Sequence, residues 1–261
     1  MLLEMRLCAI KYLSVGFLWF LWTFSANAIP QDTQSLEAET FVLGVQNFDF
    51  FPHYNFTDQN KNSLLEEVLA LFELKTGIKL RAVALPTKRL EYAFFESKEV
   101  DLIYPANKRW YKDKPGAVHY SNSLVTSISG TMVIEKGLPL KKIRAISIPF
   151  GFTPVKWNEE QDARQVQIFG VPDAKMAMQM VVNHRVQAAD VEYNVAEHLN
   201  LQYGYDLVLD TNLPLSNPEF QFASIKHPQL ITLLNQFLAE NKDEIATIKR
   251  QLYIKESIAS L

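Results

Sequence analysis

The fold is decided by residues 40–104, TFVLGVQNFDFFPHYNFTDQNKNSLLEEVLALFELKTGIKLRAVALPTKRLEYAFFESKEVDLIY. Short apolar runs rich in β-branched residues alternate in it with segments of helical periodicity. We expect buried strands at 40–45, 78–85 and 100–104, because each is a short apolar run bounded by loop-forming residues.

Two helices are expected between these strands. Ser63 with Glu66 forms a capping box, and Gly77 supplies the stop of the first helix. A shorter helix at 89–96 buries Leu90. A strand–helix–strand–helix–strand unit is typical of a parallel sheet with helices on both faces, so the fold class is α/β.

The rest of the chain contains a second, smaller unit of the same kind. A long connection, 105–124, leads to it. Further strands are expected at 127–136, 144–148, 166–171, 188–192 and 220–225, and further helices at 173–184, 228–240 and 242–253.

The chain-breaking residues Gly137, Pro139 and Pro214 interrupt the pattern at two places, which we interpret as crossings between two lobes. The predicted lobes are 29–136 with 217–261, and 137–216.

The amino terminus has the three parts of a secretory signal peptide. Arg6 and Lys11 precede an apolar run at 12–24, and the small-residue sequence Ala26-Asn27-Ala28 follows it. The alternative, a membrane anchor, needs ~20 apolar residues, which this run does not reach. We therefore expect a signal peptide at 1–28, cleavage near Ala28 and a periplasmic location.

Composition limits the chemistry of the exported chain. Cys8, the one cysteine, lies in the predicted leader, so neither disulfides nor thiolate metal ligands are expected. The net charge of −3 gives no reason to expect nucleic acid binding. A chain of this length can bury a core without covalent links.

Four segments carry a resemblance to a known family: FVLGVQNFDFFPHY (41–54), ALPTKRLEYAFFESKEVDLIYPAN (84–107), HYSNSL (119–124) and FASIKHPQLITLLNQFLAEN (222–241). Over about 40–253 the chain resembles the extracellular solute-binding proteins of family 3, the amino-acid type of periplasmic binding protein that serves ABC transporters. The resemblance implies a two-lobed fold of type II, with a small polar solute held in the cleft between the lobes.

The aromatic loop after the first strand is one candidate for the ligand site. At least one aromatic side chain of this loop could stack on a planar or apolar part of a ligand, because the loop follows the carboxyl end of a strand. The cluster consists of Phe48, Phe50, Phe51, Pro52 and Tyr54, and we prefer Phe48 and Phe51 within it. The alternative is that alternating members of this loop pack into the core.

The resemblance implies an arginine that grips a ligand carboxylate in the connection after the third strand. Here the sequence departs from the family. Arg109 comes several residues too early, beside Asn107 in the loop 105–110. Both are candidates, and the alternative for Arg109 is a solvated basic loop.

Two further candidates belong to the second lobe. Thr153 before Pro154 is typical of a helix start, whose free N–H groups can bind an anion or serve only their own helix. Glu192 falls where the resemblance implies an acidic residue that binds a ligand amine, and Asp190 shares its face of the strand. The alternative for Glu192 is a salt bridge on the surface or between the lobes.

We therefore expect a monomeric periplasmic protein that captures a small polar, amino-acid-like solute and presents it to a membrane transporter of the ABC type. Neither cofactor nor metal nor catalysis is expected, since the sequence has no paired-histidine helix, nucleophile elbow or phosphate loop. The alternatives are a ligand sensor for a membrane receptor and a cleft enzyme such as a dehydratase.

Overall fold

The computed structural model describes residues 40–56, 62–114, 116–152, 155–158 and 165–260. The predicted signal peptide, 1–28, lies outside these residues, and so does Thr153.

The first sheet has the strand order β4-β1-β5-β12-β6. Its strands are β1 (Thr40–Gln46), β4 (Lys79–Leu85), β5 (Leu102–Ala106), β6 (His119–Thr126) and β12 (Glu219–Ser224). β1 pairs in parallel with β4 and β5, whereas β12 runs antiparallel to β5 and β6. The parallel part confirms the arrangement expected from residues 40–104. β6 was not predicted, because it lies in what the sequence suggested was a long connection.

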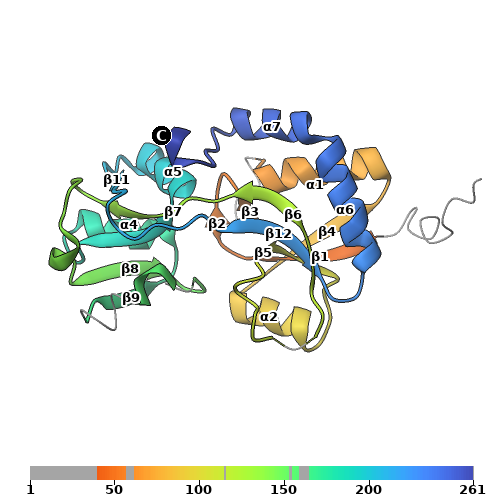
Figure 1. The fold of residues 1–261 in the computed structure, drawn as a ribbon, viewed down its shortest axis with the longest axis horizontal. Helices are drawn as coiled ribbons and strands as arrows, with labels where there is room; N and C mark the ends of the chain where they lie inside the picture. Colours follow the sequence, from red (N-terminus) through yellow and green to blue (C-terminus); the bar gives the residue numbers. More distant parts are fainter. Residues whose placement is uncertain (1–39, 57–61, 115, 153–154, 159–164, 261) are drawn as a thin grey trace, which may run out of the picture. The chain divides into compact units, whose positions relative to one another are not determined.

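Three helices pack on this sheet: α1 (Leu64–Thr76), α2 (Thr87–Phe95) and α6 (Pro228–Glu240). A fourth helix, α7 (Lys242–Gln251), packs on α1 and α6. The predicted capping box and the glycine stop of α1 are both present. In Figure 1, α2 lies on the opposite side of the sheet from α1 and α6. Gly44 of β1 lets α2 approach closely, since a Cβ there would lie 2.4 Å from Leu90 Cδ1.

The second sheet has the order β11-β7-β10-β8-β9. Its strands are β7 (Ser129–Val133), β8 (Ala145–Pro149), β9 (Gln167–Val171), β10 (Ala188–Glu192) and β11 (Val208–Leu209), and it carries α4 (Ala174–Val182) and α5 (Tyr193–Tyr203). β10, β8 and β9 are parallel, and β7 is antiparallel to β10.

β7 is the place where the structure differs from the expected lobe boundary. The sequence assigned the strand at 127–136 to the first lobe, but β7 pairs with β10 and β11 in the second sheet. The chain therefore changes sheet at Ser127 and Ile128, between β6 and β7. Below, the first lobe is the first sheet with its helices, and the second lobe is the second sheet with its helices.

Three segments connect the lobes. The first is the β6–β7 link, and the second is the segment between β11 and β12, which returns to the first lobe. These two links run side by side at Ser129 and Ser216, which exchange backbone hydrogen bonds of 2.8 and 3.0 Å. After α7 the chain turns back to α5, where the Lys255 N–H donates to Asn194 Oδ1 at 2.7 Å. The carboxyl end thus lies beside α5 (Figure 1).

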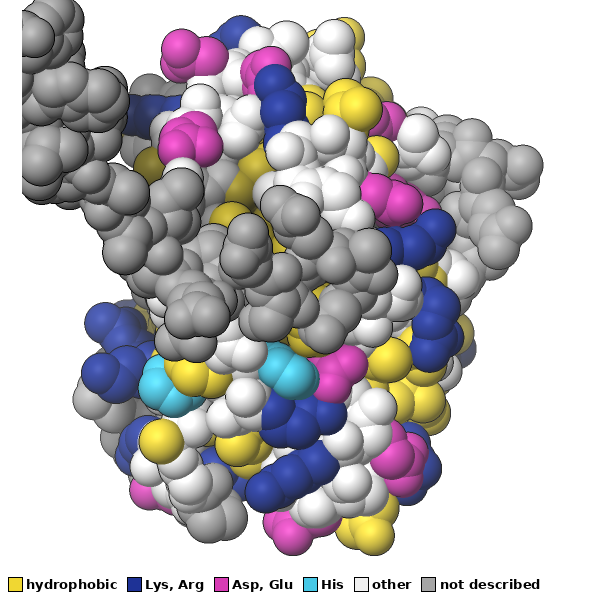
Figure 2. Space-filling view, turned by 90° about the vertical axis from the view of Figure 1, so that its right-hand side faces the viewer, with side chains coloured by type: hydrophobic (Ala, Val, Ile, Leu, Met, Phe, Trp, Pro, Cys, Tyr) yellow, Lys and Arg dark blue, Asp and Glu magenta, His cyan; other side chains and the backbone are white. Residues whose placement is uncertain are grey.

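No helix in the part of the chain that the structure describes is long and apolar enough to cross a membrane. The face shown in Figure 2 mixes basic, acidic and hydrophobic side chains, with neither charge sign gathered into one area.

Candidate functional site

A cavity of about 160 Å³ lies between the two sheets and takes its walls from both lobes. Because one water needs about 10–15 Å³ of such a volume, there is room for roughly ten waters or for one solute of similar size. The carboxyl ends of β1, β8 and β10 meet here, as expected for ligand sites of parallel sheets.

Aromatic rings form much of the cavity wall. Phe50, Tyr54, Trp110 and Phe220 come from the first lobe, and Phe152 comes from the loop after β8 in the second. Phe50 and Phe152 stack across the cleft with ring centroids 5.5 Å apart and an interplanar angle of 26°. The wall therefore offers ring faces and edges against which a flat apolar group can pack.

Tyr54 also supplies a polar edge. Its hydroxyl donates to Gln46 Oε1 at 2.7 Å. Burial raises the pKa of Tyr54 well above its ordinary value, so the phenol stays protonated as a donor.

The second lobe contributes a buried ion pair to the cavity. Lys156, in a short 3-10 helix (Val155–Trp157), donates to Asp190 Oδ1, and it also donates to the hydroxyl of Ser129 at 2.7 Å. The side chains of Lys156 and Asp190 are 8% and 6% exposed. Burial lowers the pKa of Lys156 and raises that of Asp190, while their mutual contact opposes both shifts.

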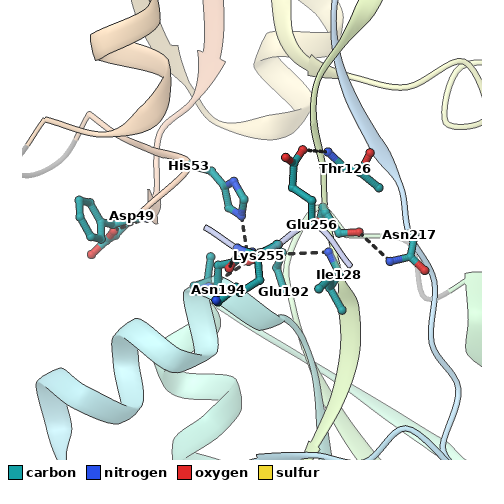
Figure 3. A network of polar contacts seen from close by, with 12 residues as sticks. Asp49, His53, Thr126, Ile128, Glu192, Asn194, Asn217, Lys255 and Glu256 are labelled. Carbon is teal, nitrogen blue, oxygen red and sulfur yellow. Dashed lines mark hydrogen bonds and ion pairs between the residues drawn. The ribbon is translucent and has the colours of Figure 1, made fainter. Parts of the chain in front are cut away.

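Glu192 joins the two lobes (Figure 3). Its Oε2 accepts from the Val195 N–H at 2.9 Å, which makes Glu192 the N-cap of α5, and the same oxygen lies 2.9 Å from His53 Nε2 of the first lobe. Its Oε1 accepts from Asn194 Nδ2 at 2.8 Å and from the Ile128 N–H at 3.3 Å. Burial alone would raise the pKa of Glu192, but His53 and these donors lower it overall.

Ser127, in the link between β6 and β7, is a polar group that the protein leaves unsatisfied. Its side chain lines the cavity and is 1% exposed, yet its Oγ has no hydrogen-bond partner among the described residues. Buried hydroxyls are normally hydrogen-bonded, so a ligand in the cavity could pair with this one.

At the cleft mouth the two lobes touch. Gly151 has φ +89°, and a Cβ built there would lie 2.5 Å from Thr87 Oγ1 at the start of α2. Glycine is needed at this point both for the backbone angle and for the close approach.

Of the predicted ligand residues, the structure brings Tyr54 and Glu192 to the cavity. Glu192 has both carboxylate oxygens engaged, and its contact with His53 runs from one lobe to the other.

The other aromatic candidates do not line the cavity. Phe48 packs against Phe152 with ring centroids 5.7 Å apart, and Phe51 packs on His198 of α5 at 4.5 Å. The neighbouring Phe50 faces the cavity instead.

Asn107 and Arg109 also lie away from the cavity. Asn107 Nδ2 donates to the Glu219 carbonyl at 2.8 Å, and Arg109 is exposed. The Trp110 N–H donates to the Asn107 carbonyl at 3.0 Å, which closes a turn that points Trp110 rather than Arg109 toward the cavity.

Sequence reasoning missed Lys156, Trp110, Phe152 and Ser127. Lys156 gave no signal, since it meets Asp190 only through the tertiary fold. Phe152 had one, because it directly follows the turn at Gly151, just after the expected strand 144–148.

The two sheets, their paired links and the interlobe cavity define the class: this is the two-lobed fold of periplasmic solute-binding proteins, as the resemblance implied. No family model and no curated protein match the sequence. Solved structures with the same fold include a periplasmic VFT2 domain of BvgS from Bordetella pertussis, at 20% identity over 82% of this chain and 93% of that one, with a TM-score of 0.65.

Two reconstructed ancestral proteins are also similar. An ancestral arginine-binding protein bound to arginine matches at 14% identity and a TM-score of 0.67, covering 84% of this chain and all (100%) of that one. The ancestral amino acid-binding protein AncCDT-1, described as a precursor of cyclohexadienyl dehydratase, matches at 17% identity and a TM-score of 0.62, covering 82% and 95%. At such identities the likeness is one of fold.

Proposed function

We propose that this chain is an exported periplasmic protein that captures a small solute in the cavity between its lobes and presents it to an ABC-type membrane transporter. The observation that carries the proposal is the cavity itself, whose aromatic and polar walls come from both lobes. A solute bound there touches both lobes at once, so binding favours the closed arrangement over an open one.

Two features support solute binding in particular. The unpartnered hydroxyl of Ser127 lacks a hydrogen bond that a ligand could provide. The Gly151–Thr87 contact lies at the cleft mouth, where closure would shield a bound solute.

Ligand sensing for a membrane receptor is the second candidate, favoured by the likeness to the BvgS periplasmic domain. It uses the same cavity and differs only in the partner. Catalysis is the third, favoured by the likeness to the dehydratase precursor. Mass spectrometry of a bound solute over hours separates binding, in which the solute is recovered unchanged, from turnover.

A thermal-shift screen of metabolites against the purified protein tests the proposal. A solute at one hundred times its Kd stabilises the folded state by about 2.7 kcal/mol, which raises Tm by several degrees in a domain of this size. We expect one chemical class to give this shift with one solute bound per chain. No shift from any small solute would contradict the proposal.

A further inference from the structure

The carboxylates of the cavity share one property, which is that each already contacts a basic side chain of this chain. Asp190 is paired with Lys156, Glu192 with His53 at 2.9 Å, and Glu91 with Lys114 at 3.1 Å. A ligand ammonium group entering the cavity therefore meets no unpaired carboxylate among the described lining residues.

The pairing of Asp190 is deep and independent of lobe closure. Asp190, Lys156 and the bridging hydroxyl of Ser129 all belong to the second lobe, and the two charged side chains are less than a tenth exposed. To reach Asp190, a ligand ammonium would have to displace the Lys156 ammonium and leave it buried without a counter-ion, which is strongly unfavourable because the buried charge loses its hydration.

The groups that remain available to a ligand include an N–H of Lys156, the Ser127 hydroxyl and several ring faces. The Lys156 ammonium has three N–H donors, and Asp190 and Ser129 accept two of them, which leaves one for a ligand. The Ser127 hydroxyl is unpartnered among the described residues. The rings of Phe50, Phe152 and Trp110 line the same space.

We propose that Lys156 is a built-in counter-ion that occupies the place of a ligand ammonium on Asp190. The cleft then takes a flat ring compound that lacks an ammonium group and carries an oxygen acceptor for Ser127 and Lys156. This inference rests on the proposed function and narrows it to a class of solute different from ordinary amino acids.

Four probes with one phenyl ring test the inference by calorimetry: 3-phenylpropionate, 3-phenylpropanamide, phenylalanine and 2-phenylethylamine. The first two carry an acceptor without an ammonium, and they distinguish a charged from a neutral acceptor. For the wild-type protein we expect at least one of them to bind at least tenfold more tightly than phenylalanine, and 2-phenylethylamine to bind most weakly.

Two variants isolate the role of Lys156. In Lys156→Gln, Asp190 loses its cation, so the affinity for 2-phenylethylamine relative to 3-phenylpropionate should rise at least tenfold. Lys141→Gln, an exposed lysine of the same lobe, is the matched control and should keep the wild-type order. If Lys156→Gln does not fold, the double variant Lys156→Gln with Asp190→Asn removes both charges, and it should lose the discrimination against phenylalanine.

The inference would be overturned if the wild-type protein bound phenylalanine as tightly as 3-phenylpropionate. It would also be overturned if the order of the probes stayed unchanged in Lys156→Gln and in the double variant. A metabolite that binds the cavity but has no ring, or that bears an ammonium, would also overturn it while leaving the proposed function intact. A protein that binds neither probes nor metabolites would overturn both.

Discussion

Replacement of Glu192 by alanine tests whether the contact between the lobes stabilises the fold. The Glu192 side chain contacts His53 at 2.9 Å, caps α5 and accepts from the Ile128 N–H in the β6–β7 link. Breaking a buried pair by removing one partner costs about 3–5 kcal/mol, because the groups left behind stay buried without partners. We expect Glu192→Ala to lower the free energy of unfolding by about that amount.

Asp173→Ala is the matched control. Asp173 caps α4 in the same lobe by accepting from the Met176 N–H at 2.7 Å, but it has no ion pair among the described residues. Loss of such a cap costs about 0.5–2 kcal/mol. Urea unfolding of both variants should therefore give a difference of about 1–4.5 kcal/mol, with the larger loss in Glu192→Ala. Equal losses in the two variants would show that Glu192 acts only as a helix cap, and would refute the reasoning about the buried contact.

Three further outcomes are expected. Because the pKa of Glu192 is lowered in the folded state, its charge stabilises the fold above its ordinary pKa of 4.5. The advantage of wild type over Glu192→Gln in urea unfolding should therefore shrink as the pH falls below that value. A constant difference from pH 7 to pH 3 would contradict the lowered pKa. Gly151→Ala should weaken solute binding measured by calorimetry, since its Cβ would collide with Thr87 across the cleft. The control Gly77→Ala, at φ +75° with open space around it, should cost about 1 kcal/mol of stability and leave affinity unchanged. Equal affinity in both variants would argue against the contact between Gly151 and Thr87. Intact-mass analysis of periplasmic protein should give a chain that begins near Ile29, and retention of residues 1–28 would contradict export with cleavage.

The sequence predicted the elements whose signals are local. The first β-α-β-α-β unit followed from apolar periodicity, the capping box at Ser63 and the stop at Gly77. β6 was missed because its sequence HYSNSLVT is largely polar and lies in a sheet whose core strand β12 comes from far along the chain. α5 was missed because β10 runs into it at Glu192 without a chain-breaking residue, and glutamate is not among the usual N-caps.

The candidate site was predictable in position but not in detail. Strand ends placed Tyr54 and Glu192 at the cleft, since ligands of parallel sheets gather there. The geometry of each turn decides whether Phe50 or Phe51 faces the cavity, and likewise Trp110 or Arg109. A shift of one residue along the turn would exchange the two side chains. The pairing of Lys156 with Asp190 joins residues 34 apart in the sequence, and no local pattern encodes it.

Calorimetry on two variants of one loop tests the central claim most directly, namely that a solute binds in the cavity between the lobes. Phe152 lines the cavity and stacks on Phe50, whereas Phe150, two residues earlier, is 60% exposed and lies outside the cavity wall. With the solute that gives the largest thermal shift, Phe152→Ala should weaken binding by about 1–3 kcal/mol, the loss typical of an aromatic anchor, and Phe150→Ala should bind as wild type does. Unchanged affinity in Phe152→Ala, with one solute still bound per chain, would place the binding site outside this cavity.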